Sequence, residues 1–237
     1  MSRDDTHGKL VALCGIDGSG KTTQTELLAA HAREAGCTVE TISFPRYEEG
    51  FFGDVIRRYL RGEFAESAGG VDPRLAALPY ACDRWEAAGL LRRWLADGKL
   101  VICNRYVAAN MAHQGAKIED AAGRAEFYSW IDRMEYEVFG LPRPDLQVLL
   151  RVPPSVAAGL MRGRGSDARL PSADDIHESD AAYLEATARA YREAAELTPG
   201  PWAEVCCTED RKMLPPERIA GAVWKHVEPI LKERKPK

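Results

Sequence analysis

The chain has 237 residues, of which 45% are hydrophobic and 29% are charged, a composition typical of a globular protein. This length allows one large domain or two small ones. The net charge of −4 favours neither a nucleic acid nor an anionic membrane as the main partner. No run of 18 apolar residues is present and the polar N-terminus lacks a signal-peptide core, so we expect a cytoplasmic protein without a membrane span. Six cysteines without a C-x-x-C pair indicate reduced thiols rather than a disulfide set or a zinc site.

The first predicted strand leads directly into a phosphate-binding motif. The apolar run Leu10–Cys14 predicts a buried strand, and residues 15–22, GIDGSGKT, match the pattern G-x-x-x-x-G-K-[ST] before a helical pattern begins. Glycines in such a loop let backbone N–H groups face a phosphate, and the helix N-terminus adds its dipole. We expect Lys21 to reach the β- and γ-phosphates of a nucleoside triphosphate and Thr22 to hold Mg²⁺. The predicted triphosphate-binding residues are Gly15, Asp17, Gly18, Ser19, Gly20, Lys21, Thr22 and Thr23.

Strand and helix patterns alternate along the rest of the chain. Strands are predicted over residues 38–44, 100–103, 145–152 and 202–207. Helices are predicted from the motif to residue 35, and over residues 51–61, 73–97, 127–138, 183–197 and 219–230. The polar segment 161–178, rich in charged and turn-forming residues, predicts a mobile loop. Without a linker or a repeat, this alternation indicates a single α/β domain over residues 1–237, a three-layer α/β/α fold around a five-stranded parallel sheet.

Polar motifs follow several of the predicted strands, at the sheet edge where α/β folds bind ligands. Arg46 follows the second strand, Arg105 follows the third, and Arg162 and Arg164 lie in the 161–178 segment. A lone arginine is most often a solvated surface charge, but arginines beside a phosphate loop bind phosphate bidentately. The pattern therefore indicates a kinase of a small phosphorylated acceptor, with an arginine loop that closes over the triphosphate and excludes water.

Four motifs together resemble those of one family. The phosphate loop is followed by F-P-R at residues 44–46, Y-A-C-D-R-W-E at 80–86 and N-R-Y-V-A-A-N-M-A-H-Q-G at 104–115. In this order and spacing they resemble the thymidylate kinases of the nucleoside-monophosphate kinase group, over nearly the whole chain. The resemblance implies a P-loop kinase with a mobile lid at about residues 161–178, which transfers the γ-phosphate of ATP to dTMP in dTTP synthesis. It further implies Mg²⁺ as cofactor and a homodimer packed through helices.

The resemblance also implies roles for individual residues. Asp17 matches the acid that holds the sugar 3′-hydroxyl, and Arg46 and Arg105 match the clamps for the acceptor phosphate. Tyr80 matches the aromatic residue that stacks on thymine, and Arg84 matches the arginine that bonds to its edge. The implied dTMP-binding residues are Asp17, Arg46, Tyr80, Arg84, Arg105, Asn110, His113 and Gln114.

The phosphate loop itself contains no arginine, which resembles the subgroup whose catalytic arginines come from the lid. The implied catalytic residues are then Lys21, Arg105, Arg162 and Arg164. We expect no general base, because a phosphate monoester has a second pKa near ~6 and is mostly dianionic at neutral pH.

Three residues depart from the family pattern. Asn104 replaces the usual aspartate, which predicts a weaker electrostatic hold on Mg²⁺ but no necessary loss of catalysis. Ala109 stands where serine is frequent, so we expect one hydrogen bond near the base to be missing. His113 replaces the usual Tyr or Phe under the sugar. Either the imidazole fills the same space, which is the interpretation we favour, or selectivity for deoxyribose is relaxed.

Two other functions are compatible with the sequence. One is a kinase of another nucleoside monophosphate or of a deoxynucleoside, and the other is a catalytically weak nucleotide-binding or regulatory protein, which Asn104 favours. Trp130 and Met134 fit either a dimer surface or ordinary core. Four carboxylates on the predicted helices are interpreted as surface charges, namely Asp83, Glu86, Asp132 and Glu135.

Overall fold

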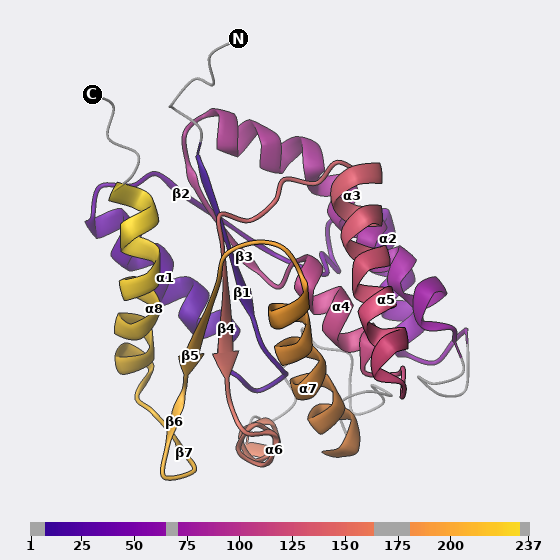
Figure 1. Ribbon diagram of the computed structural model, residues 1–237. Coiled ribbons are helices and arrows are strands. Elements are labelled where there is room, and N and C mark those ends of the chain that lie inside the picture. The colour runs from indigo at the N-terminus through magenta and orange to yellow at the C-terminus, as the bar shows by residue number, and fades with distance from the viewer. Residues whose placement is uncertain (1–7, 65–70, 164–180, 233–237) are drawn as a thin grey trace.

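The computed structural model describes residues 8–64, 71–163 and 181–232. The main sheet consists of β1 (Lys9–Cys14), β2 (Val39–Ser43), β3 (Leu100–Asn104), β4 (Leu146–Arg151) and β5 (Trp202–Cys206). All five strands are parallel, in the order β2–β3–β1–β4–β5 (Figure 1). The central strand β1 pairs with β3 on one side and with β4 on the other, so the predicted five-stranded parallel sheet is confirmed.

Eight helices are present among the described residues. They are α1 (Lys21–Glu34), α2 (Phe51–Leu60), α3 (Pro73–Ala96), α4 (Val107–Gly115), α5 (Ala121–Asp132), α6 (Pro154–Gly163), α7 (Ala181–Leu197) and α8 (Pro216–Lys232). Helices α1 and α8 pack together on one face of the sheet, whereas α3, α4, α5 and α7 lie on the other face (Figure 1). This arrangement is the predicted three-layer α/β/α fold.

The core lies where the two helix layers meet the sheet. Side chains of the central strands are buried on both faces, as their continuous apolar sequences predict; Leu10, Val101 and Val148 are fully buried. A second, smaller cluster joins α2 to α3 through Ile56 and Ala76. Helix α2 thereby has a fixed position beside α3, which carries several of the predicted site residues.

The structure adds elements that the sequence patterns do not predict. Helix α4 is buried on nearly every side, so its sequence has no amphipathic period to indicate a helix. The predicted helix 127–138 consists of α5 and a π-helical segment, Arg133–Val138. A short antiparallel hairpin, β6 (Thr208–Glu209) and β7 (Lys212–Met213), follows β5. Helix α6 extends to Gly163, so the predicted loop start at residue 161 is wrong, and residues 164–178 lie outside the described ranges.

None of the helices in the described ranges is long and apolar enough to cross a membrane. All six cysteines fall within those ranges and none forms a disulfide. Burial raises the pKa of the Cys14 and Cys207 thiols to about 12, which suits the predicted role of reduced, apolar side chains. Cys206, at the end of β5, is exposed instead.

Candidate active site

The polar motifs that follow three strands lie at one edge of the sheet. Strand β3 lies between β1 and β2, and the register pairs Asn104 with both Leu13 and Ser43. The phosphate loop after β1, Arg46 after β2 and Arg105 after β3 therefore come from neighbouring strand ends. The predicted meeting of these segments at the carboxyl edge is confirmed.

The phosphate loop folds around the amino group of Lys21. Lys21 Nζ donates hydrogen bonds to the carbonyl oxygens of Gly15, at 3.0 Å, and Ile16, at 2.8 Å. It also lies 3.8 Å from a carboxylate oxygen of Asp17. Position 18 needs glycine, because φ is +77° there and a Cβ atom would lie 2.7 Å from the Ala157 carbonyl oxygen. The loop thus holds a buried cation at the N-terminus of α1, where the helix dipole also favours an anion.

Arg105 is the first residue after β3 and has a rare backbone conformation. Its φ is +65°, in the left-handed region, and its N–H donates to the Leu13 carbonyl oxygen at 3.0 Å. The guanidinium forms an ion pair with the Asp17 carboxylate and lies 2.8 Å from His113 Nε2. Three predicted site residues from the phosphate loop, the end of β3 and α4 are therefore in contact.

His113 uses both ring nitrogens. Because a guanidinium only donates, Nε2 accepts from Arg105 and the ring proton lies on Nδ1. Nδ1 is 3.1 Å from the hydroxyl oxygen of Tyr183, and this hydroxyl donates to the His113 carbonyl oxygen, also at 3.1 Å. The imidazole therefore holds Arg105 relative to α7, which goes beyond filling the space of an aromatic ring. No sequence pattern indicates that Tyr183 forms hydrogen bonds with His113.

Asp17 is negatively charged at neutral pH although it is largely enclosed. Burial acts to raise its pKa, but the charges of Arg105 and Lys21 outweigh burial and hold the pKa well below its usual range. In Arg105, burial is likewise outweighed by the Asp17 charge, which raises the pKa of the guanidinium. A phosphate that binds Arg105 must therefore either displace the Asp17 carboxylate or share the guanidinium with it.

Arg46 is fixed by carboxylates of α3. Its Nε donates to Asp83 at 3.0 Å, its main-chain N–H donates to the other oxygen of the same carboxylate at 2.9 Å, and Nη2 donates to Glu86 at 2.8 Å. Asp83 is fully buried, and burial raises its pKa against the effect of the Arg46 charge. The interpretation of Asp83 as a surface charge is therefore wrong. The fold tolerates this buried carboxylate because the ion pair with Arg46 compensates for the lost hydration.

Arg84 and Asn110 meet at a second buried carboxylate, that of Glu135. Arg84 is 2% exposed and binds Glu135 bidentately, through Nε at 2.5 Å and Nη2 at 2.7 Å. Asn110 Nδ2 donates to the same carboxylate at 2.9 Å. The side-chain oxygens of Asn110 and Gln114 are buried and accept no hydrogen bond from a described residue. Such acceptors suit a ligand that carries hydrogen-bond donors. Because Glu135 is fully buried, its interpretation as a surface charge is wrong.

The remaining predicted residues lie at the margins of this site. Tyr80 is half-buried on α3, one turn before Arg84, and its ring is perpendicular to that of Tyr59. Arg162 belongs to the last turn of α6, a helix that packs on the phosphate loop. Its side chain, together with Arg164 and the rest of the predicted lid, lies outside what the structure describes.

Oxygen groups for a divalent cation lie at the start of α1 and the end of β3. Thr22 Oγ1 is 3.4 Å from Asn104 Nδ2, and the Asn104 side-chain oxygen is buried without a partner among the described residues. Within the same ranges, no group of three or more His, Cys, Asp or Glu side chains could hold a metal. These groups fit Mg²⁺, an ion that usually keeps water and phosphate oxygens as most of its ligands.

The sequence carries a signal for Glu135 that the surface interpretation overlooks. Counted from Phe127, the apolar residues Ile131 and Met134 stand at +4 and +7, and Glu135 stands at +8 on the same helix face. A carboxylate on an apolar face needs a donor or a cation as partner. The identity of that partner, Arg84, has no comparable signal, because it lies 51 residues away in the chain.

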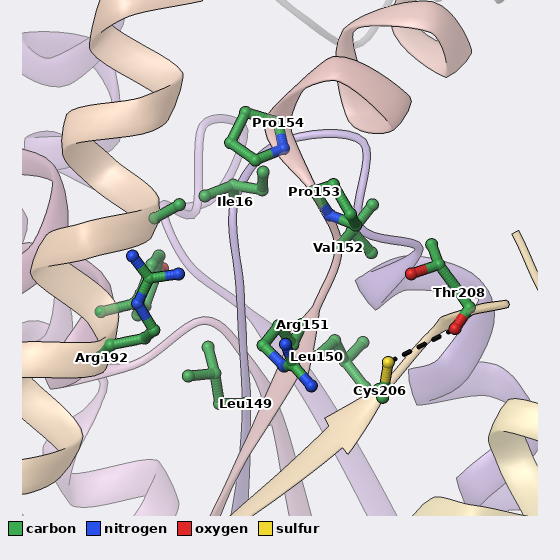
Figure 2. Close-up of a pocket in the computed structure, with 12 residues that line it drawn as sticks. Ile16, Leu149, Leu150, Arg151, Val152, Pro153, Pro154, Arg192, Cys206 and Thr208 are labelled. Atoms are coloured by element: carbon green, nitrogen blue, oxygen red, sulfur yellow. Dashed lines mark hydrogen bonds between the residues drawn. The ribbon is translucent and has the colours of Figure 1, made fainter. Parts of the chain in front are cut away.

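A cavity of about 220 Å³ lies beside the phosphate loop (Figure 2). Ile16 lines it from the loop, Leu149 and Pro153 from β4 and the turn after it, and Arg192 from α7. Most of its lining is apolar, and none of its lining residues is a predicted site residue. The charged groups described above therefore lie outside this cavity.

A phosphate loop that lies next to arginines fixed at neighbouring strand ends is the arrangement of P-loop kinases. The family described as thymidylate kinase matches residues 13–210. The chain is 37% identical to the thymidylate kinase of Mycobacterium tuberculosis over 217 residues, which are 90% of this chain and 96% of that relative. It is 34% identical to the thymidylate kinase of Thermomicrobium roseum over 219 residues, 92% and 93% of the two chains. The chain belongs to the thymidylate kinase family, as its motifs predict.

Replacing Asp17 with asparagine should lower the free energy of unfolding by about 2 kcal/mol at neutral pH, because Arg105 loses its charged partner. The Asp17 charge stabilises the fold above its unfolded pKa of about 4, and this stability is lost as the pH falls through the depressed pKa of the folded protein. The difference between wild type and Asp17→Asn should therefore shrink below about pH 4. Denaturant unfolding at several pH values measures this stability difference. A difference that does not depend on pH would contradict a charged Asp17 paired with Arg105.

Proposed function

We propose that this protein transfers the γ-phosphate of ATP to the phosphate of dTMP and releases dTDP and ADP. Membership of the thymidylate kinase family supports this reaction. The observation that carries the proposal is the position of Arg46 and Arg105, which are held at strand ends next to the phosphate loop. An acceptor that carries its own phosphate can bind these arginines beside the triphosphate.

On the donor side, the loop N–H groups and Lys21 neutralise the β- and γ-phosphates. To do so, Lys21 exchanges its bonds to the Gly15 and Ile16 carbonyl oxygens for phosphate oxygens. We assign Arg162 and Arg164 to the same phosphates from the lid, whose closure excludes water. No general base is needed, since the attacking phosphate oxygen is already ionised at neutral pH.

On the acceptor side, Arg46 and Arg105 bind the dTMP phosphate and Asp17 accepts a hydrogen bond from the 3′-hydroxyl. Asp83 orients Arg46, and His113 orients Arg105. Side chains held in this way lose little freedom when the phosphate binds. The acceptor oxygen is then aligned with the γ-phosphorus for in-line attack.

Base recognition is assigned to α3 and α4. Tyr80 stacks on the thymine ring, Arg84 donates to the keto oxygen O4, and the Asn110 side-chain oxygen accepts the N3–H group. Gln114 supplies a further buried acceptor toward the sugar, one turn after Asn110 on α4. Cytosine reverses the donor and acceptor at positions 3 and 4 of the ring, so the hydrogen-bond pattern disfavours dCMP.

We assign Mg²⁺ to the region between Thr22 and Asn104. Bound there, Mg²⁺ supplies charge neutralisation on the β- and γ-phosphate oxygens. Thr22 Oγ1 would hold the ion, and the buried Asn104 oxygen would support it by accepting a hydrogen bond from its water shell. Because the Asn104 amide is neutral, this end of the site carries one negative charge less than it would with the aspartate usual in the family.

The proposal is tested by ADP release from ATP and Mg²⁺ with dTMP, dUMP, UMP, dCMP, dGMP and thymidine as acceptors. We expect the fastest turnover with dTMP and none with thymidine, which lacks the phosphate that the arginines bind. If another monophosphate is turned over faster than dTMP, that monophosphate is the acceptor and dTMP is not. Turnover of no acceptor, despite measurable ATP binding, would favour a regulatory protein. Equal turnover of UMP and dUMP would show relaxed deoxyribose selectivity at His113.

Asn104→Asp should lower the Mg²⁺ concentration needed for the half-maximal rate by about fivefold, because an added charge near the metal contributes on the order of 1 kcal/mol. Magnesium titrations of the rate at saturating ATP and dTMP measure this shift. Asn104→Ala is the matched control and should raise that concentration. If both variants keep the wild-type rate and magnesium dependence, position 104 has no role at the metal.

We further propose a homodimer formed through the outer face of α3. Leu75, Leu78 and Trp85 share one face of this helix and are 62%, 37% and 54% exposed. An exposed apolar face of this kind suits a contact with another protein. Trp130 and Met134, the positions considered from sequence, pack against the core instead.

Trp85→Glu should convert a dimer into a monomer, because it places a charge within the proposed contact. Sedimentation equilibrium at micromolar concentration measures the assembly state. Leu197→Glu is the matched control, since Leu197 is similarly exposed at the end of α7, and this variant should stay dimeric. A monomeric wild type would contradict the proposal.

A further inference from the structure

We propose that Glu135 sets the base specificity of the acceptor site by fixing the side-chain amide of Asn110, an inference that rests on the dTMP-binding role proposed above. Glu135 is fully buried and belongs to the π-helical segment Arg133–Val138, a type of turn that often occurs at functional sites. Its carboxylate accepts three hydrogen bonds, two from Arg84 and one from Asn110. It is therefore the point at which α3, α4 and the π-helical segment are joined.

The contacts of Asn110 allow one orientation of its amide. Nδ2 donates to Glu135 Oε1 at 2.9 Å and to the Ala77 carbonyl oxygen at 3.1 Å. Both partners are acceptors, so the NH₂ group must face them and both of its protons are used. The Asn110 oxygen consequently points away from Glu135, and it is buried without a donor among the residues described. A ligand at this position meets an acceptor and not a donor.

Glu135 also sets the plane of the Arg84 guanidinium. Its two oxygens bind Nε and Nη2, which leaves the other guanidinium N–H groups for a ligand. One carboxylate thus orients both the acceptor of Asn110 and the donors of Arg84. This pattern is complementary to a ring that carries N3–H beside a keto group, as in thymine. In cytosine, N3 would face the Asn110 oxygen with a lone pair, which is repulsive.

The chain contains a second Arg–Glu pair that serves as a structural counterpart. Arg124 binds Glu193 bidentately at 2.6 and 2.8 Å and joins α5 to α7. Neither residue of this pair is a hydrogen-bond partner of Asn110. Loss of the Glu193 charge therefore reports the cost of breaking such a pair without altering the amide of Asn110.

The test measures dissociation constants for dTMP and dCMP by isothermal titration calorimetry on the full chain. Glu135→Gln keeps the size of the side chain but presents an N–H group to Arg84 or Asn110, so the Ala77 carbonyl oxygen alone is left to hold the Asn110 amide in its orientation. Wild type should bind dTMP at least about a hundredfold more tightly than dCMP. This is the ratio of dissociation constants expected when two hydrogen bonds to buried groups are lost. In Glu135→Gln this ratio should fall by at least about tenfold, with ATP binding unchanged. In Glu193→Gln the ratio should stay at the wild-type value.

The outcomes separate this inference from the function on which it rests. If wild type does not prefer dTMP to dCMP, the proposed dTMP site fails, and the role of Glu135 fails with it. If wild type prefers dTMP and Glu135→Gln keeps the ratio, the role of Glu135 is overturned while the proposed function stands. Should the variant not fold, dTMP methylated at N3 is used with wild type. Binding at least about tenfold weaker than dTMP supports a fixed acceptor, and equal binding overturns it.

Discussion

Charge compensation is the constraint on which the active site depends. Four cationic side chains are gathered near one edge of the sheet, where a buried charge without a partner would cost several kcal/mol. Each of them is met by oxygen atoms of the protein. Lys21 has the carbonyl oxygens of its own loop, and the three arginines, Arg46, Arg84 and Arg105, have the carboxylates of Asp83, Glu135 and Asp17. The fold can therefore hold this positive charge before any nucleotide binds.

The compensating groups differ in how readily a phosphate can displace them. Asp83 and Glu135 are fully buried, and they bind their arginines through several hydrogen bonds each. Asp17 belongs to the phosphate loop itself and is partly exposed. A phosphate at Arg105 therefore meets a carboxylate that is still partly accessible to solvent. At Arg46 and Arg84, the carboxylates act as fixed supports that orient the guanidinium groups.

The strand order explains why these groups meet. Strand β3 lies between β1 and β2, so the ends of three strands far apart in the sequence become neighbours. Helix α6 closes the other side of the phosphate loop, where the Ala157 carbonyl oxygen leaves no room for a side chain at position 18. Helix α4 packs against both α3 and α7, where Asn110 donates to the Ala77 carbonyl oxygen and His113 lies next to the Tyr183 hydroxyl. Helix α4 is thereby held by its neighbours on two sides, as a preorganised site requires.

Sequence patterns alone are enough to predict the phosphate loop, the alternation of strands and helices and the edge of the sheet at which arginines gather. These features depend on local patterns: the glycine spacing before Lys21, the apolar strand sequences, and the positions of Arg46 and Arg105 directly after strands. The pairing of the charges, in contrast, is visible only in the folded protein. Asp83 and Glu135 lie 37 and 51 residues from the arginines they bind. No local pattern encodes such a pairing, because it arises from the packing of α3 against the end of β2 and against the π-helical segment. Helix α4 was missed for a related reason, since a helix buried on nearly every side has no polar face to reveal its period.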